Sequence, residues 1–304
     1  MFAGTDEELT MGTGALVWRR VLTMAIVPAV LGMSAVAGAA QEATPSAEVF
    51  GDDGVLTNCV DPSFPPMEYF ENQEAQEPIG FDIDLINAVG ERLGVEVEHI
   101  PSDFTGLLPA LEAGRCDVVA SGIYLTAERL ETFDAQPYYD TSVILLTPAD
   151  NADITSPEDL AGKTVAVQAG TNYINILNDL NAELQAAGQP GIDIQSYPDQ
   201  TDAIQQLVVG RADATITQDT EAAFRETAQP GQFKIAYTYP EAETFGIYFR
   251  QGSEQMAATL AETVEGMRDD GTLAEIAEIW NLPVEGTDFS TEVPSATPEA
   301  TPAA

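Results

Sequence analysis

The sequence predicts an α/β fold built from two similar lobes, and three observations support this prediction. Strand-like and helix-like segments alternate through residues 55–283, which is typical of α/β proteins with largely parallel sheets. The stretch from Gly94 to Asp117 recurs from Gly191 to Asp213, with the same order of glycine, strand, proline, helix and Gly-Arg-x-Asp. The length of 304 residues also fits about two units. With only two copies of the repeat, a solenoid is not expected.

Local patterns define the elements of the first lobe in chain order. Residues 55–60 form a predicted strand, and Asp82 is placed to cap a helix that ends at Gly94. Residues 95–100 alternate valine with glutamate, which predicts a half-buried strand. The remaining elements are a short helix over 105–113, ended by Gly114, and a buried strand over 117–121.

In the second lobe, a strand over 164–168 runs into a glycine turn over 169–172 and then into a helix whose apolar face includes Tyr173. A strand, a glycine turn and a helix start together form an anion site from free backbone N–H groups. In the first lobe, Thr126 is expected to cap a helix that carries Arg129 in its first turn. An arginine there opposes the helix dipole unless it binds an anion. The two lobes thus offer two donors to one carboxylate.

Arg129 also has a simpler interpretation, a surface pair with Glu128, Glu131 or Asp134. Ligands of such sheets bind at the carboxyl ends of the strands, here where the lobes face each other. A rigid, proline-rich loop over 61–66 follows the first strand and presents an acid and an aromatic ring at that place.

The charge of the chain restricts its partners. It has 50 acidic and 11 basic residues, a formal net charge of −39. A nucleic-acid partner is not expected, because a polyanion requires a basic surface. The acid excess indicates a solvated surface that supports solubility, and adaptation to high salt is the alternative explanation.

The two ends of the chain differ in composition from its middle. Arg19 and Arg20 precede an uncharged run over 21–40 that ends in small residues, the layout of a secretory signal cleaved near Ala40. A retained membrane anchor is the alternative, and the paired arginines suggest a twin-arginine export route. We expect residues 1–40 to be a signal peptide, 41–54 a flexible linker and 284–304 a disordered tail.

The residues that could carry other chemistry are few. Cys59 and Cys116 are the only cysteines; export permits a disulfide between them, and two buried thiols are the alternative. With the single histidine, His99, they do not make a zinc site of the usual composition, although a site made of carboxylates alone stays open. Residues 162–164 resemble the end of a phosphate-binding loop, but Pro157 replaces its first glycine and a strand follows it. No metal or other cofactor is expected.

Seven motifs in sequence resemble the extracellular solute-binding proteins of polar amino-acid ABC transporters. They span residues 61–69 (Asp-Pro-Ser-Phe-Pro-Pro-Met-Glu-Tyr), 80–85, 114–122, 126–129, 137–139, 159–171 and 270–273. The resemblance covers about residues 55–282 and implies a periplasmic-binding-protein-like fold, in which each lobe is a mostly parallel sheet flanked by helices. It implies lobe 1 over 55–141 plus 245–283, lobe 2 over 142–244, and crossings near 141–146 and 238–247.

The resemblance also implies roles for individual residues. Arg129 with Thr171 and Asn172 would hold the α-carboxylate of an amino acid, and Ser121 with Gly122 would help to hold its ammonium. The other ligand-binding residues expected are Phe64 and Phe104 beside the ligand side chain, Asp61 facing it, and Tyr124 and Gln168. Tyr124 stands where the family commonly has a small residue, which predicts a narrower pocket or a phenol contact. Met67 replaces the usual aromatic residue.

The ammonium site departs from the family pattern. The acid that binds the ammonium in the family would align with Gln218, and Asp219 follows one residue later. We expect Asp219 to be the ammonium partner and Gln218 to contact the ligand side chain, because a buried ammonium prefers a carboxylate. The alternatives are that Asp219 caps the following helix and that Gln218 alone holds the ligand.

The resemblance implies an exported, monomeric binding protein, periplasmic or at the cell surface, that captures an amino acid and delivers it to a membrane ABC permease without chemistry. Asp61 favours a polar or cationic ligand side chain, and a neutral ligand that hydrogen-bonds to it is the alternative. A secreted cyclohexadienyl or arogenate dehydratase-like enzyme is the alternative, since it shares this fold. A receptor sensor domain is the third class. The absence of a second hydrophobic span after Asn281 argues against it.

Overall fold

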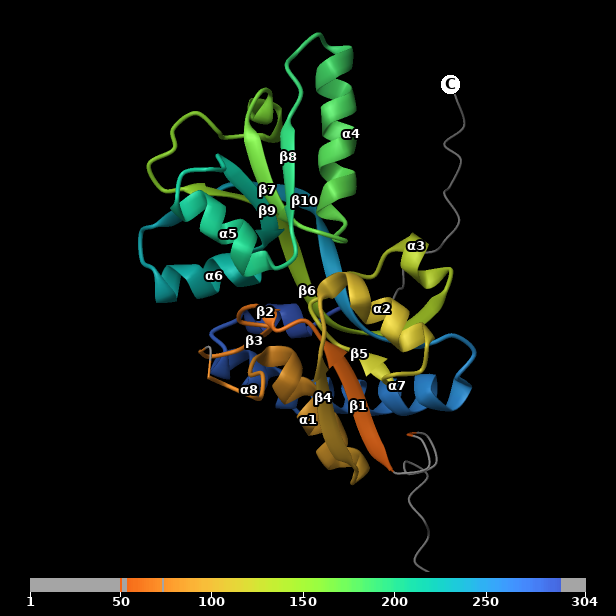
Figure 1. Ribbon diagram of the computed structural model, residues 1–304. Coiled ribbons are helices and arrows are strands. Elements are labelled where there is room, and N and C mark those ends of the chain that lie inside the picture. The colour runs from red at the N-terminus through yellow and green to blue at the C-terminus, as the bar shows by residue number, and fades with distance from the viewer. Residues whose placement is uncertain (1–49, 51–53, 73, 291–304) are drawn as a thin grey trace, which may run out of the picture. The chain divides into compact units, whose positions relative to one another are not determined.

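The computed structural model describes residues 50, 54–72 and 74–290 (Figure 1). The expected signal peptide and most of the expected linker and tail lie outside these residues. The strands are β1 (Val55–Val60), β2 (Ser63–Phe64), β3 (Glu68–Tyr69), β4 (Glu96–Pro101), β5 (Val118–Val119), β6 (Phe133–Pro148), β7 (Thr164–Gln168), β8 (Asp193–Tyr197), β9 (Ala214–Gln218) and β10 (Phe233–Arg250). The α-helices are α1 (Phe81–Leu93), α2 (Phe104–Glu112), α3 (Ala127–Leu130), α4 (Tyr173–Ala186), α5 (Gln200–Val208), α6 (Asp219–Ala228), α7 (Glu254–Asp269) and α8 (Thr272–Ile279), and two 3₁₀ turns are η2 (Pro157–Leu160) and η3 (Val284–Thr287).

The fold is the two-lobed α/β arrangement that the sequence predicts. The strands follow the order β4-β1-β5-β10-β6-β9-β7-β8. Strands β4, β1 and β5 are parallel in lobe 1, and β8, β7 and β9 are parallel in lobe 2. The name lobe 1 denotes the elements around β1, and the name lobe 2 denotes those around β7.

Two long antiparallel strands, β6 and β10, connect the lobes (Figure 1). The end of β10 pairs with β5 in lobe 1, whereas the end of β6 pairs with β9 in lobe 2. The pairing register between them shifts between Thr238 and Ala242, inside the second predicted crossing. Both crossings therefore lie within continuous strands.

The sequence repeat corresponds to a structural repeat. The unit β4-α2-β5 of lobe 1 matches β8-α5-β9 of lobe 2, and α2 and α5 each have nine residues. The aspartate of each Gly-Arg-x-Asp motif has the same role: Asp117 accepts a hydrogen bond from the backbone N–H of Thr57 at 3.0 Å, and Asp213 accepts one from that of Thr164 at 2.9 Å. The repeated aspartates thus stabilise the parallel strands and do not belong to a binding site.

The two cysteines form a disulfide. Cys59 of β1 and Cys116 are joined, with their Cα atoms 5.8 Å apart. The bond links β1 to the loop before β5 within a buried apolar cluster that also contains Leu107, Leu111 and Tyr248. The alternative of two free thiols is therefore wrong.

Several sequence expectations need correction. Asp82 does not cap α1, whose N-cap is Gly80; the Asp82 carboxylate instead accepts hydrogen bonds from the N–H of Gly122 and the hydroxyl of Tyr138. The predicted strand over 117–121 is only two residues long, because the chain turns toward the cavity after Val119. The Thr126 cap is confirmed, since its hydroxyl accepts a hydrogen bond from the N–H of Arg129.

The packed part of the chain extends beyond both expected limits. Phe50, within the expected linker, is fully buried in the main core. Residues of the expected tail continue the fold as η3, and Phe289 is buried there, with the Arg268 guanidinium over its ring. These two aromatic residues thus lie in apolar surroundings that the local composition does not reveal. No helix in the described part of the chain has the length and apolarity to cross a membrane.

Candidate functional site

A cavity lies where the two lobes meet. Its lining residues are Phe64, Glu68, Phe104, Ser121, Gly122, Tyr124 and Arg129 from lobe 1, and Gln168, Thr171, Asn172, Tyr173, Gln200 and Gln218 from lobe 2. Ten of the twelve predicted site residues are among them; Asp61 and Asp219 are not. The lobes also contact each other directly, since the Gln168 amide donates to the Asp61 carboxylate at 2.5 Å.

Arg129 contributes positive charge to the cavity. It sits in the first turn of α3, where its guanidinium donates to the carbonyl of Tyr124 at 3.0 Å and lies 5.9 Å from the ring centre of Phe104. Among the described residues, no carboxylate forms an ion pair with it within 4.0 Å. The interpretation of Arg129 as a member of a surface ion pair is therefore wrong.

Glu68 contributes a carboxyl group that the sequence reasoning did not include. It belongs to β3 and is only 1% exposed, and its Oε1 accepts a hydrogen bond from the Ser121 hydroxyl at 3.0 Å. Its Oε2 is buried without a protein hydrogen-bond donor. Burial, together with the negative charge of Asp82, raises the pKa of Glu68. A cationic group of a ligand would compensate this carboxyl.

Asp82 lies behind Glu68 in the wall of the cavity. It is fully buried, and burial raises its pKa even though Gly122 and Tyr138 donate hydrogen bonds to it. The negative charges of these two neighbouring carboxyls disfavour each other, and the charge of Asp82 adds to burial in raising the pKa of Glu68.

Asp61 lies beside the cavity, although the sequence placed it inside. Its carboxylate accepts hydrogen bonds from Gln168 and from the Ser63 hydroxyl, and burial raises its pKa to about 7. Its backbone N–H donates to the Ser121 hydroxyl at 2.9 Å. That hydroxyl, which also donates to Glu68, has no further hydrogen to offer a ligand.

Aromatic side chains close other sides of the cavity. The hydroxyls of Tyr124 in lobe 1 and Tyr173 in lobe 2 lie 3.4 Å apart, and the Tyr124 ring stacks on Phe245. Gly122 has a φ of +53°, and a Cβ there would lie 2.8 Å from the ring of Phe64. Tyr124 thus contacts the opposite lobe through its phenol hydroxyl at the cavity.

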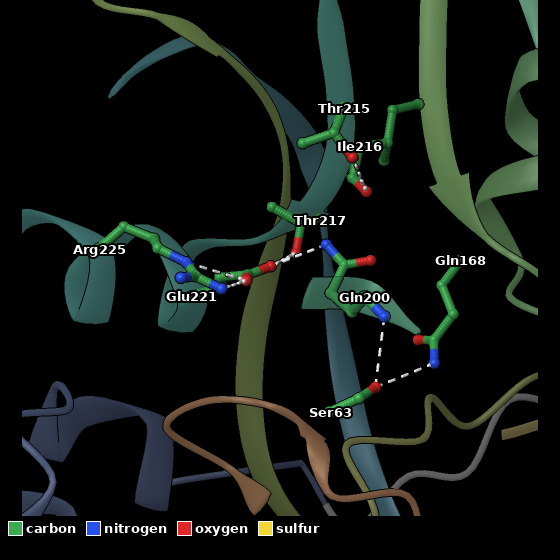
Figure 2. A network of polar contacts seen from close by, with 8 residues as sticks. All are labelled: Ser63, Gln168, Gln200, Thr215, Ile216, Thr217, Glu221 and Arg225. Atoms are coloured by element: carbon green, nitrogen blue, oxygen red, sulfur yellow. Dashed lines mark hydrogen bonds and ion pairs between the residues drawn. The ribbon is translucent and has the colours of Figure 1, made fainter. Parts of the chain in front are cut away.

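A buried polar network lies on the lobe 2 side of the cavity (Figure 2). The Gln200 amide nitrogen donates to Glu221 Oε2 at 2.7 Å, and the Thr217 hydroxyl donates to the same oxygen at 2.7 Å. Arg225 donates to the other carboxylate oxygen at 2.9 Å, one helical turn further along α6. The backbone N–H of Gln200 reaches Ser63 of lobe 1 at 3.3 Å.

Asp219 does not face the cavity. It is the first residue of α6, with Gln218 as the N-cap, and its carboxylate accepts a hydrogen bond from the Thr141 hydroxyl at 2.7 Å. Strand β9 ends at Gln218 and helix α6 begins at Asp219, so Gln218 lines the cavity and Asp219 does not. The geometry therefore contradicts the expectation that Asp219 binds the ammonium.

Three lining residues, Glu68, Tyr173 and Gln200, were missing from the predicted set. The repeat contains a signal for Gln200: it begins α5 as Phe104 begins α2, and Phe104 was predicted. Glu68 lies within the motif at 61–69, where only the first acid was considered. His99 of β4 contacts Asn58 of β1 and Asn87 of α1 and does not line the cavity. The described residues include no group of three or more His, Cys, Asp or Glu able to hold a metal.

Two α/β lobes joined by two strand crossings, with a polar cavity between them, define a binding protein for a small solute. The chain belongs to the bacterial extracellular solute-binding proteins, family 3, whose family model matches residues 56–283.

Curated relatives include the arginine-binding protein ArgT of Corynebacterium glutamicum, 30% identical over 236 residues that cover 77% of each chain. The L-cystine-binding protein TcyA of Bacillus subtilis is 28% identical over 229 residues, 75% of this chain and 81% of the relative. Among solved structures, an ancestral arginine-binding protein bound to arginine has a TM-score of 0.68 and 33% identity, covering 75% of this chain and 98% of that one. The ancestral amino acid-binding protein AncCDT-1, a precursor of cyclohexadienyl dehydratase, has a TM-score of 0.66 and 30% identity, covering 75% and 95%.

Proposed function

We propose that this protein is exported, captures a free amino acid between its lobes as a monomer and delivers it to a membrane ABC permease without chemical change. Family membership and the names of the relatives support this proposal. The observation that carries it is Arg129, a cavity-lining guanidinium that no carboxylate of the described residues neutralises within 4.0 Å.

The ligand α-carboxylate binds between the lobes. Arg129 supplies charge-assisted hydrogen bonds from lobe 1. Thr171 and Asn172, at the start of α4, supply backbone N–H groups from lobe 2, since the first N–H groups of a helix have no partner within it. A carboxylate bound at both places would hold the lobes together.

The other end of the ligand carries a cation or neutral N–H donors. Glu68 has a buried carboxylate oxygen without a donor, and two further buried acids, Asp82 and Asp61, lie in contact with the residues around it. Among the residues that the structure describes, Arg129 is the only basic one that lines the cavity. This excess of acid favours cationic and neutral polar amino acids and disfavours acidic ones.

Calorimetric titration of ligand-stripped protein with L-arginine, L-citrulline and L-glutamate tests the proposal. Citrulline has nearly the shape of arginine without its side-chain charge, so the arginine-to-citrulline ratio measures the contribution of the acids. We expect L-arginine or L-citrulline to bind and L-glutamate to bind at least tenfold more weakly. Tightest binding of L-glutamate would contradict the assignment of Glu68, and failure of all twenty amino acids and L-cystine to bind would reject the proposed function.

A dehydratase activity is the second candidate, because AncCDT-1 is a precursor of such an enzyme. Incubation with prephenate or arogenate separates the two candidates. We expect no product, and turnover that Glu68→Gln abolishes would establish the enzymatic alternative.

A further inference from the structure

Gln200 has a buried acceptor atom at the cavity that nothing in the protein satisfies. The residue is 1% exposed, lines the cavity and begins α5, and its Oε1 has no hydrogen-bond partner. A buried amide oxygen without a donor is costly, of the order of 1–3 kcal/mol. Such an atom beside a ligand cavity calls for a donor from the ligand.

The orientation of the amide follows from its neighbour. Glu221 is fully buried, and its Oε2 accepts hydrogen bonds from the Gln200 amide nitrogen and from the Thr217 hydroxyl. A carboxylate only accepts, so it fixes the NH₂ group of Gln200 toward itself and the oxygen away from itself. Figure 2 shows the amide oxygen of Gln200 on the side away from Glu221.

Glu221 can hold this position because Arg225 neutralises it. The two form an ion pair at 2.9 Å, in which the Arg225 side chain is 11% exposed and the Glu221 side chain is 0% exposed. Without this pair, the buried charge of Glu221 would be uncompensated, and its carboxylate would lose the partner that holds it in place as the acceptor for Gln200. The ion pair therefore sets the orientation of an uncharged residue in the cavity.

We propose that Gln200 is a ligand-binding residue whose Oε1 accepts a hydrogen bond from an N–H group of the bound amino acid, and that Glu221 with Arg225 positions it. This inference rests on the proposed function. Neither Asp219, which is turned away, nor Glu221 lines the cavity. The polarised amide of Gln200 therefore accepts the hydrogen bond from the N–H group of the ligand on the lobe 2 side.

The test uses Gln200→Met, Glu221→Gln and the double variant of the full chain. L-arginine, L-glutamine and L-cystine are titrated into each, and the tightest wild-type binder of the three is the probe. We expect Gln200→Met to weaken the probe about tenfold to hundredfold, the loss typical of a hydrogen bond to a charged group. Gln205→Met, an exposed site on the same helix, is the control and should leave affinity unchanged.

The positioning role predicts non-additive effects. Glu221→Gln should weaken the probe in the wild-type background and have little further effect on affinity in Gln200→Met, whereas its effect on melting temperature should be similar in both. Additive losses of affinity would overturn the positioning role. Glu226→Gln, on the exposed side of α6, is the matched control.

Analogues of the probe identify the N–H group. The 2-deamino analogue lacks the α-ammonium, and a second analogue lacks the side-chain nitrogen. The affinity difference between the probe and one of these analogues should shrink in Gln200→Met. Wild-type affinity of Gln200→Met, or unchanged differences for both analogues, would show that Oε1 meets only water and overturn the proposal. Failure of the wild-type protein to bind any amino acid would reject the proposed function and this inference together.

Discussion

Replacement of Asp61 by asparagine should make the ligand-free protein more stable at neutral and alkaline pH. Asp61 is 3% exposed, and burial raises its pKa from 3.8 to about 7. The shift of about three units corresponds to about 4 kcal/mol, at roughly 1.4 kcal/mol per unit. The hydrogen bonds from Gln168 and Ser63 favour the ionised form but do not outweigh burial.

The sign follows from proton binding. The folded state binds the Asp61 proton more tightly than the unfolded state, so the free energy of unfolding falls as pH rises from about 4 to about 7 and is constant above that range. Below about pH 4 both states hold the proton and the carboxyl has no cost. Asparagine does not ionise, so the variant should gain up to about 4 kcal/mol at pH 8 and nothing at pH 4.

Urea unfolding between pH 4 and 8 measures this difference. The two proteins should have equal stability at pH 4 and diverge as pH rises, with unchanged m-values. Asp150→Asn removes an exposed acid and controls for the reduced repulsion in a chain of net charge −39. Parallel profiles for wild type and Asp61→Asn across this range would refute the reasoning.

Three further predictions concern binding and stability. Arg129→Ala should weaken amino-acid binding by about 2–5 kcal/mol in calorimetry with little change in melting temperature, whereas the exposed Arg211→Ala should bind normally; equal affinities would remove Arg129 from the site. Reduction of the disulfide between Cys59 and Cys116, 57 residues apart, should cost about 4 kcal/mol and lower the calorimetric melting temperature by roughly 10 °C; an unchanged transition would contradict its stabilising role. Gly170→Ala should weaken binding and enlarge the radius of gyration with ligand in small-angle scattering, because a Cβ there would lie 2.8 Å from Thr105 in the opposite lobe; Gly188→Ala, with similar positive φ and no neighbour within 4 Å, should do neither.

Much of the fold could be predicted because it depends on local patterns and on the repeat. The strands over 55–60 and 164–168 have the expected limits, and Gly94 ends α1 in the left-handed conformation. The short strand β5 and the buried Phe50 were not predictable in the same way. Both depend on contacts with distant parts of the chain, which override the local pattern.

The candidate site was predicted in outline because loops after strands and helix starts carry its residues. The errors concern where single side chains point. Asp61 is held beside the cavity by a long-range contact with Gln168 of the other lobe, whereas Asp219 is turned away locally, where β9 becomes α6. Glu68 was overlooked because its burial depends on Asp82 and Ser121, which are distant in sequence.

The two lobes contribute different chemistry to the cavity. The carboxyl group of Glu68 and the guanidinium of Arg129 both line the cavity from lobe 1, whereas lobe 2 contributes amides, hydroxyls and backbone N–H groups. Glu221 of lobe 2 lies behind Gln200 and is neutralised by Arg225. A charged group on the lobe 2 side would lose its hydration when the lobes meet. The free energy of this desolvation is offset only if an opposite charge of the ligand lies next to the group. Amides lose less, and they can hydrogen-bond across the interface without a ligand, as Gln168 does with Asp61. On the proposed function, lobe 1 would therefore supply most of the recognition of the charged ends of the ligand, and lobe 2 would add hydrogen bonds whose geometry selects among ligands of equal charge.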